Sequence, residues 1–355
     1  MKRILVYTTQ MMETGGIESH VREFCFHMKS AGIEIDLIVL NAQMPQDMEN
    51  LFKSICHRIF LCKNGRSYSR LLWLIHISRI CRSFKYDAIY SNGQGNSIAL
   101  LRLLLKRQTR WVHHHHMAGD KKDQMTWTAA YRSVLMKSSK VIACSKQNAL
   151  EMQNALHRDI DTIPCFSRKI EGNNFPRDNG AAVRFGYYGR LIPEKGIATL
   201  CRLSDDQDFN KVEFHIWGEG IAYPASFFDQ YPKLRYHGKF NSEDGLADVL
   251  RTIDAFLLLS VHPEGLPISL LEAMGFGLPW LATDKGGIPD IVCDPISTRV
   301  IPSTSSYTHM KNAVLSFAED IAAGKISGEA QQELYAEKFS SSRLLWRWKE
   351  VLGIV

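Results

Sequence analysis

Short apolar runs alternate with longer amphipathic segments along the first half of the chain. The apolar runs have the length and composition of β-strands, and they lie at residues 2–8, 35–40, 87–91, 110–112 and 140–144. Helix-length segments separate them. Strands that alternate with helices are typical of a parallel, doubly wound sheet. The first half therefore predicts one Rossmann-like α/β domain.

The same pattern begins again after a loop-like stretch at residues 171–180. Strand-like runs follow at residues 184–188, 213–217, 234–237, 255–260 and 280–283, again with helices between them. A chain of 355 residues also exceeds one ordinary domain. We therefore expect two Rossmann-like domains, at residues 1–166 and 167–339, and a C-terminal helix at about 340–355 that packs back on the first.

Composition narrows the class of protein. Hydrophobic residues make up 45% of the chain, and no apolar run approaches the roughly 20 residues that cross a bilayer. Residues 1–7 hold only a short apolar stretch and fit a strand better than a signal peptide. The eight cysteines show no C-x-x-C spacing, which predicts buried or free thiols rather than disulfides or zinc. We expect a cytoplasmic protein.

Charge is distributed unevenly between the two halves. Residues 1–170 carry a net charge of +12 and residues 171–355 a net charge of −6. This asymmetry suggests that the first half faces membrane headgroups, nucleic acid or a phosphorylated substrate, although an evenly solvated basic surface is the simpler interpretation. The helical stretches at residues 66–85 and 100–110 interleave apolar and basic residues, so they fit either an anionic membrane surface or ordinary packing on the sheet.

The strongest chemical signal is a pair of glutamates eight residues apart, Glu264 and Glu272. They follow an apolar strand and precede a helical pattern, so the first belongs to a loop and the second lies about two turns into the helix. Ionised carboxylates accept the paired hydrogen bonds of sugar and ribose hydroxyls. The amides around Leu266, Pro267 and Ile268 stand at the helix N-terminus, where free N–H groups and the helix dipole favour a phosphate.

Two further motifs stand where a first strand ends. In the second half, Gly189-Arg190 and Lys195-Gly196 place two cations five residues apart in a glycine-bounded loop, which suits a diphosphate without a metal. Parallel sheets bind their ligands at this edge. In the first half, Gly15-Gly16 stands at the corresponding place, where small residues let the backbone approach a ligand.

Together these motifs resemble the family 4 (group 1) glycosyltransferases of the two-Rossmann-domain, GT-B type. The resemblance rests on Gly-Gly-x-Glu near the start, Gly-Arg-Leu-x-x-Glu-Lys-Gly in mid-chain and Glu-x7-Glu near residue 270, and it covers nearly the whole chain. Further matching pieces begin at Trp217, His237 and Lys285. The resemblance implies two domains facing a central cleft and transfer of a hexose-type sugar from a nucleotide-diphospho-sugar, with retained anomeric configuration and no metal or other cofactor.

The resemblance also implies roles for individual residues. Arg190 and Lys195 match positions that bind the donor diphosphate, Glu264 matches one that contacts the transferred sugar, and Glu272 matches one that holds the ribose. Lys239 and Phe240 match a stretch beside the nucleobase, and Gly16 matches a position that approaches the diphosphate from the other domain. The expected catalytic residues are His116, Glu264, Arg190 and Lys195. The expected donor-binding residues are Gly15, Gly16, Gly189, Arg190, Lys195, Gly218, Lys239, Phe240, Glu264, Gly265, Leu266, Pro267, Ile268 and Glu272.

Four consecutive histidines, His113 to His116, end a strand of the first half. In the resembling family one histidine at this strand end lines the donor sugar, and the register assigns that place to His116. Because strand side chains alternate, His114 shares a face with His116, and the other two point the opposite way. Core or acceptor-side histidines with no single essential member are the alternative. We expect no metal here, since adjacent histidines on one strand cannot all converge on one ion.

The sequence departs from the family pattern at Ile163-Pro164-Cys165-Phe166, where Asn-Gly commonly follows the proline. The geometry of the linker is therefore open, while the donor motifs are intact. Asp159-Ile160-Asp161 matches the D-x-D of metal-dependent sugar transferases, but it ends a helical segment in a different architecture and is interpreted as surface charge.

Partners and rival functions follow from these motifs. We expect a UDP- or GDP-linked sugar donor, a glycan or lipid-linked acceptor, an anionic membrane surface as a further partner, and no nucleic acid. The rival functions are a nucleotide-sugar epimerase of the same architecture and a non-catalytic nucleotide-binding subunit. A Rossmann oxidoreductase is disfavoured because no G-x-G-x-x-G follows Val6.

Overall fold

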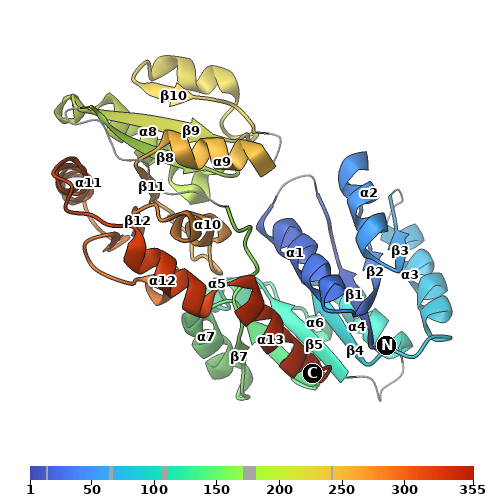
Figure 1. Cartoon of the computed structure of the whole chain (residues 1–355). Coiled ribbons are helices and arrows are strands. Elements are labelled where there is room, and N and C mark those ends of the chain that lie inside the picture. Colours follow the sequence, from blue (N-terminus) through green and yellow to red (C-terminus); the bar gives the residue numbers. More distant parts are fainter. Residues whose placement is uncertain (13–14, 64–66, 106–109, 171–180, 241–242) are drawn as a thin grey trace. The chain divides into compact units, whose positions relative to one another are not determined.

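The computed structural model describes residues 1–12, 15–63, 67–105, 110–170, 181–240 and 243–355 (Figure 1). The chain forms two compact units, and each is described here by itself. The first unit comprises Met1–Phe166 and Ser341–Val355, and the second comprises Ser167–Ser340.

Within its described residues, the first unit holds a seven-stranded, all-parallel sheet. Its strands are β1 (Arg3–Thr8), β2 (Glu34–Val39), β3 (Arg58–Leu61), β4 (Ala88–Asn92), β5 (Arg110–His115), β6 (Lys140–Ala143) and β7 (Asp161–Thr162). Their order is β3-β2-β1-β4-β5-β6-β7, the Rossmann order, which reverses direction between β1 and β4.

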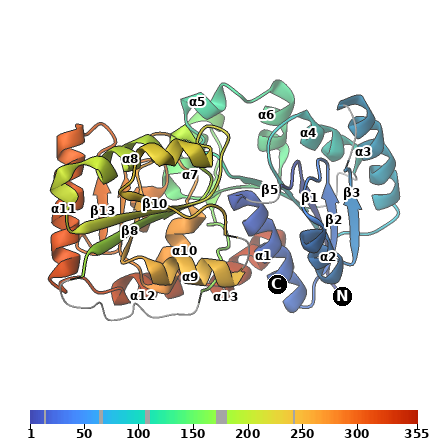
Figure 2. The ribbon, with the colours of Figure 1, turned by 90° about the horizontal axis from the view of Figure 1, so that it is seen from above.

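Helices cover both faces of this sheet (Figure 2). They are α1 (Gly16–Ser30), α2 (Gln46–Ile55), α3 (Ser67–Cys81), α4 (Asn96–Leu104), α5 (Lys121–Gln124), α6 (Ala129–Lys137), α7 (Lys146–Leu156) and α13 (Ser341–Leu352). On β1, Ile4 and Val6 face the apolar side chains of α1, α2 and α13, whereas Leu5 and Tyr7 face those of α3, α4, α6 and α7. The alternation of strand side chains thus supplies two apolar cores, one on each face.

The C-terminal helix α13 completes the first of these cores. Trp348 is fully buried, and its ring lies edge-on to Phe24 of α1 and Tyr90 of β4, with centroid distances of 5.4 and 5.3 Å. Leu344 and Leu352 are buried beside it at helical spacing. The last residues of the chain therefore belong to the same unit as the first.

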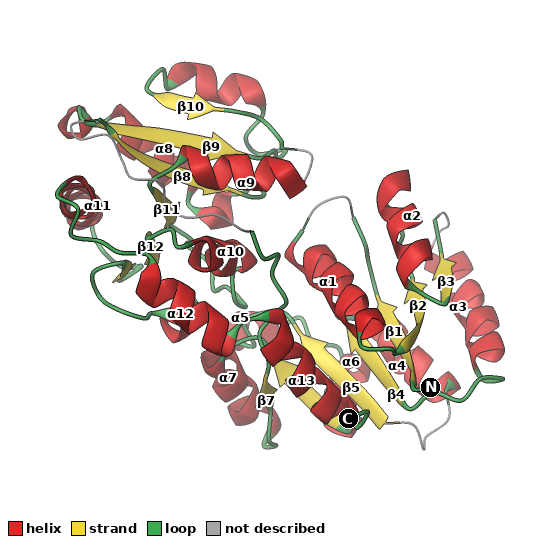
Figure 3. Cartoon of the chain, viewed as in Figure 1, coloured by secondary structure: helices red, strands yellow, loops and turns green. Residues whose placement is uncertain are grey.

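The second unit, in its described residues, holds a six-stranded parallel sheet (Figure 3). Its strands are β8 (Val183–Tyr188), β9 (Val212–Trp217), β10 (Leu234–Tyr236), β11 (Ala255–Leu258), β12 (Trp280–Thr283) and β13 (Thr298–Ile301). The order β10-β9-β8-β11-β12-β13 repeats that of the first sheet, with its reversal between β8 and β11.

The helices of this unit again lie on both sides of the sheet, α8 and α11 on one side and α9, α10 and α12 on the other (Figure 2). The helices are α8 (Ile197–Asp205), α9 (Glu243–Thr252), α10 (Ile268–Phe276), α11 (Tyr307–Ala322) and α12 (Glu329–Lys338). Short 3-10 turns lie at η1 (Pro193–Lys195), η2 (Gln207–Phe209), η3 (Ala225–Gln230) and η4 (Ile288–Ile291). On β8, Phe185 stacks on Phe317 of α11, and Tyr188 contacts α10.

The two Rossmann-like α/β sheets that the sequence predicts are confirmed, and some details are corrected. The strands β3, β7 and β13 were not predicted. The helical stretch predicted at residues 100–110 is wrong at its end, because α4 stops at Leu104 and Arg110 begins β5; residues 106–109 lie outside the described residues, as does Arg66. Asp161 lies in β7 and pairs with Lys140 at 2.8 Å. Among the described helices, none is both long and apolar enough to span a bilayer.

Candidate donor-binding site

The predicted donor residues of the second unit gather where β8 and β11 end, on either side of the strand reversal. Arg190 and Lys195 lie after β8, and Glu264 lies in the loop between β11 and α10. The backbone N–H of Val261 donates to the Glu194 carbonyl at 2.9 Å, which joins the two loops. This edge of a doubly wound sheet is where ligands bind.

Lys195 and Glu264 form an ion pair. Lys195 Nζ donates to both carboxylate oxygens of Glu264, at 2.7 and 2.8 Å, and the two side chains are only 20% and 14% exposed. The Ser260 hydroxyl donates to the same carboxylate at 2.5 Å. The carboxylate is therefore held in one orientation, and the lysine is held at the loop edge with part of its charge neutralised. Arg190, in contrast, is exposed.

Two glycines let the loops of this edge pack closely. Gly218 has φ +134°, and a Cβ atom there would overlap the carbonyl oxygen of Gly189. Gly286 has φ +59°, and a Cβ atom there would overlap the backbone of Glu264. The N–H of Gly287 also donates to the Glu264 carbonyl at 3.1 Å. The backbone around Glu264 is thus fixed by a neighbouring loop.

Glu272 has a different environment, because it is 2% exposed and both its oxygens have partners. Arg168 Nε donates to one oxygen at 2.8 Å, and the Tyr188 hydroxyl lies 3.1 Å from the other. Burial and the neighbouring Glu272 carboxylate raise the pKa of Tyr188 well above its usual value. Glu272 is the fifth residue of α10, a little more than one turn into the helix rather than the two turns predicted.

The N-terminus of α10 lies between the two glutamates. The helix begins at Ile268 after Pro267, and no side chain caps it. Leu266 and Pro267 are buried, so the loop between Gly265 and the helix is fixed by packing. An uncapped helix N-terminus presents N–H groups and a positive dipole end to an anion.

Lys239 and Phe240 lie after β10, next to this edge. Lys239 Nζ is 3.6 Å from a Glu219 carboxylate oxygen, and the Phe240 ring lies edge-on to Tyr188 at 5.9 Å. The N–H of Gly218 donates to the Gly238 carbonyl at 2.8 Å. The structure thus brings the expected donor residues of the second unit to one sheet edge.

The remaining expected residues belong to the first unit. Gly16 is the first residue of α1 and is exposed, and Gly15 precedes it. His116 directly follows β5 and is half-buried. Both lie beyond the C-terminal ends of strands of the first sheet, the edge at which the sequence placed them.

The four histidines split onto two faces of β5, as the strand alternation predicts. His113 and His115 both contact the Tyr131 hydroxyl, at 2.9 and 2.8 Å. His115 Nε2 also lies 2.7 Å from a carboxylate oxygen of Asp123. This pair therefore belongs to a satisfied buried network.

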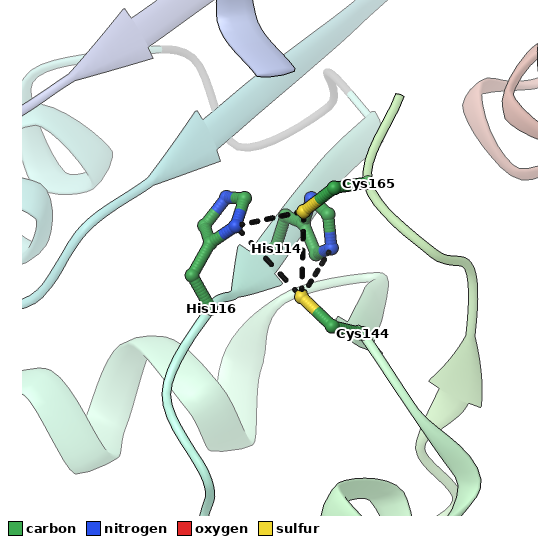
Figure 4. A group of neighbouring side chains, drawn as sticks. All are labelled: His114, His116, Cys144 and Cys165. Carbon is green, nitrogen blue, oxygen red and sulfur yellow. Dashed lines mark hydrogen bonds between the residues drawn. The ribbon is translucent and has the colours of Figure 1, made fainter. Parts of the chain in front are cut away.

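On the opposite face, His114 and His116 meet two cysteines (Figure 4). Cys144 directly follows β6, and Cys165 lies after β7. One ligand atom from each of the four side chains lies within 4.8 Å of the other three. We call these four residues the thiol–imidazole cluster.

Burial sets the protonation of the cluster. Burial, together with a smaller contribution from neighbouring histidines, lowers the pKa of His114 and that of His116 to about 3 each. The hydrogen bond from Cys165 and the nearby His116 lower the pKa of Cys144 to about 5. Both imidazoles are therefore neutral at neutral pH, the form that can bind a metal.

Reasoning from the sequence missed this cluster. It considered the histidines as a run and the cysteines by their spacing, and it did not bring the two together. Two signals in the sequence could have indicated the cluster. His114 and His116 alternate at the end of one strand, and Cys144 directly follows the next strand. Cys165 stands at a position where the sequence departs from the family pattern. The sequence also did not single out Arg168, Tyr188 or Ser260 as partners of the two glutamates.

Comparison with known proteins identifies the class. The family model described as "Glycosyltransferase Family 4" matches residues 14–166, and the model described as "Glycosyl transferases group 1" matches residues 175–333. Between them they cover both halves of the chain. The chain belongs to the family 4 (group 1) glycosyltransferases, and its fold class is GT-B.

Individual relatives are distant. "Uncharacterized glycosyltransferase MJ1178" of Methanocaldococcus jannaschii is 26% identical over 336 residues, which are 92% of this chain and 91% of that protein. Among solved structures, TarM of S. aureus has a TM-score of 0.79 at 14% identity, with 99% of each chain covered. Anabaena HepE in complex with UDP-glucose has a TM-score of 0.77 at 15% identity, over 99% of this chain and all of that one.

Proposed function

We propose that this glycosyltransferase moves a hexose-type sugar from a nucleotide-diphospho-sugar to a glycan or lipid-linked acceptor with retention of configuration, in surface polysaccharide or glycolipid biosynthesis. The observation that carries the proposal is the Lys195–Glu264 ion pair beside the uncapped N-terminus of α10, with exposed Arg190 in the adjoining loop. Cations, helix N–H groups and a fixed carboxylate suit a diphosphate joined to a sugar.

The chemistry follows from where charge develops. As the glycosidic bond breaks, negative charge builds on the leaving diphosphate, and Arg190, Lys195 and the first amides of α10 stabilise it without a metal. The diphosphate competes with Glu264 for Lys195, so the arriving donor frees carboxylate lone pairs for sugar hydroxyls. No nucleophilic side chain is assigned, and the acceptor attacks on the face that the diphosphate leaves.

A uridine nucleotide is the first donor to test, with guanosine as the alternative. HepE has been crystallised with UDP-glucose, and a TarM variant has been crystallised with α-GlcNAc-glycerol and UDP. We infer that the base lies near Lys239 and Phe240, where the ring of Phe240 offers a stacking surface. We also propose Gly16 and His116, at strand ends of the first unit, as donor-binding residues.

The acceptor side is proposed to meet an anionic membrane, with cytoplasmic, peripheral attachment. Support comes from α3, where Tyr68, Leu71 and Leu72 are 73%, 41% and 50% exposed. The basic residues Arg79 in this helix and Arg82 just after it are also exposed. Exposed apolar side chains flanked by arginine suit an anionic bilayer surface. A lipid-linked acceptor is held at such a surface.

The test begins with a panel of UDP- and GDP-sugars, whose binding is detected by a rise in melting temperature. With the donor so found, Arg190→Ala should lower kcat/KM by at least about 100-fold, the scale of a lost charged transition-state contact. Arg251→Ala is the matched control, because Arg251 pairs with Asp248 at 3.3 Å on the surface of α9.

Two outcomes contradict the proposal. Turnover that is lost on adding EDTA and restored by Mg²⁺ or Mn²⁺ would show that a metal shares the diphosphate charge. Conversion of the donor sugar to its epimer in the absence of any acceptor would identify the epimerase instead.

A further inference from the structure

We propose that the thiol–imidazole cluster binds one Zn²⁺ ion, in a closed tetrahedral site that stabilises the first unit. The ligand atoms are Nε2 of His114, Nδ1 of His116 and Sγ of Cys144 and Cys165. All four come from the first unit, so the site depends on nothing outside it.

Four of the six distances between ligand atoms are close to those of a tetrahedron around zinc, and the other two are within 4.8 Å. With ordinary zinc bond lengths, two sulfur ligands lie about 3.7 Å apart and a sulfur and a nitrogen about 3.5 Å apart. Here the two sulfurs are 3.7 Å apart. The sulfur–nitrogen distances are 3.4 Å from Cys144 to His114, 3.8 Å from Cys144 to His116 and 3.4 Å from Cys165 to His116. An ion therefore fits with small adjustments of side chains.

The kind of ligand selects the metal and the role. Two thiolates and two imidazoles in tetrahedral arrangement favour Zn²⁺ over Mg²⁺ or Ca²⁺, which prefer oxygen ligands. Four protein ligands leave no position for water or substrate, as in structural zinc sites. On binding, the Cys165 thiol loses its proton to solvent, Cys144 binds as the thiolate, and the imidazoles bind through nitrogen lone pairs. The ion would tie together the C-terminal ends of β5, β6 and β7.

The surroundings support the first histidine as a ligand. The backbone N–H of Phe166 donates to His20 Nδ1 at 2.9 Å, so the neutral His20 ring carries its proton on Nε2 and donates to the Tyr90 hydroxyl at 3.0 Å. The same hydroxyl oxygen lies 3.1 Å from His114 Nδ1 and can accept the Nδ1 proton. With that proton on Nδ1, His114 Nε2 faces the cluster with a free lone pair, the usual arrangement around a metal-bound histidine.

The second histidine links the site to catalysis, and this step rests on the proposed function. His116 Nε2 is buried and has no hydrogen-bond partner among the described residues. Zinc on Nδ1 would place the ring proton on Nε2, so the ion would fix the tautomer and the orientation of the ring. The ion thus acts as a positioning group for His116, a residue that the proposed function assigns to donor binding.

The experiment measures metal in the full-length chain carrying a tag without histidine, produced in zinc-supplemented medium. Elemental analysis after gel filtration should find one zinc per chain in the wild type. Cys144→Ser and Cys165→Ser should each lose at least about tenfold in zinc affinity, because losing an outer-shell partner of a ligand already costs about 10–100-fold. Cys201→Ser is the matched control, because Cys201 is equally buried but lies in α8 of the second unit, and it should keep its zinc.

A spectroscopic arm keeps the test valid if a variant folds poorly. Wild-type protein freed of zinc under reducing conditions and loaded with Co²⁺ should show the visible bands of tetrahedral cobalt and thiolate-to-cobalt charge transfer. Absence of both zinc and these bands in protein with reduced thiols would overturn the proposal. So would equal zinc content in all variants, or a Cys144–Cys165 disulfide in the freshly purified chain. None of these readings uses turnover, so the proposed transferase activity can fail independently.

Discussion

At the scale of single residues, the two glutamates of the donor motif differ in their burial and in their partners before any ligand binds. The Glu264 carboxylate is partly exposed and pairs with the ammonium group of Lys195. Because a lysine side chain is flexible, a diphosphate can attract this ammonium group away from Glu264. Glu272 is buried and is bound by Arg168 and Tyr188. The Glu264 carboxylate can therefore exchange its partner, whereas the Glu272 carboxylate also stabilises the fold.

This contrast predicts different effects of the same substitution. Glu264→Gln should chiefly lower kcat, because in the proposed function Glu264 contacts the transferred sugar. Glu272→Gln should weaken binding of the bare nucleoside diphosphate by about tenfold, since a charged hydrogen bond contributes about 1.5–3 kcal/mol, and it should also lower the melting temperature. Calorimetry with the nucleotide alone and thermal unfolding measure the two effects.

Glu213→Gln is the control, because Glu213 pairs with Arg235 at 2.8 Å on the surface of the same unit. The assignment is wrong if the Glu264 variant alone binds the nucleotide poorly.

The sequence predicted the charged residues of this site but not their partners. Arg190, Lys195 and Glu264 stand in motifs with fixed spacing at strand ends, so local pattern was enough to place them on one edge. Arg168 meets Glu272 across 104 positions of sequence, and Cys165 meets His116 across 49. Such contacts depend on the order of strands in the sheet, which no spacing within a short segment encodes.

At the scale of secondary-structure elements, the structure refines the membrane hypothesis. Trp73 of α3 is partly buried against the core on that face of the sheet, and Arg70 Nε is buried, so both side chains are less exposed to a bilayer than Leu71 and Leu72. The exposed residues of the helix include Leu71, Leu72 and Arg79.

We therefore expect Leu71→Ser with Leu72→Ser and Arg79→Glu to reduce binding to anionic vesicles by at least about fivefold, since one nearby basic residue contributes about 1 kcal/mol. Donor binding, a property of the second unit's motifs, should not change. Vesicle co-sedimentation at low and high salt makes the measurement.

Leu51→Ser provides the control, because Leu51 is 40% exposed on α2, on the other face of the sheet. Wild-type protein that stays in the supernatant with anionic vesicles at low salt would refute the hypothesis.

Among the described strands, prediction succeeded for the central strands and for the edge strand β10, and it failed for the other edge strands, β3, β7 and β13. The strand β7 has two residues, and β13 has four, of which Arg299 and Val300 are only half-buried. Both lie at the edges of their sheets, where a strand has a neighbouring strand on one side only. Such a strand can hold fewer apolar residues, so its sequence pattern is weak. Central strands such as β1 and β11 are buried throughout most of their length and were predicted from composition alone.

At the scale of the whole molecule, stability of the first unit should depend on the far end of the chain. Trp348→Ala removes a fully buried ring from the core that α13 completes, and such substitutions cost about 3–5 kcal/mol. Trp346→Ala on the same helix removes a ring that is 53% exposed, and it should cost far less. Chemical unfolding of the two variants measures the difference. Equal loss of stability would mean that α13 does not pack as described.

The division of the chain has a consequence for its synthesis. The second unit is one uninterrupted segment, whereas the first is split between residues 1–166 and the final fifteen, Ser341–Val355. Ser341–Val355 is synthesised after the whole of the second unit, so Phe24 and Tyr90 lack their contact with Trp348 until that segment has left the ribosome. We expect the unit that is made second to reach its native state first, and the unit that is made first to need protection by chaperones during that interval.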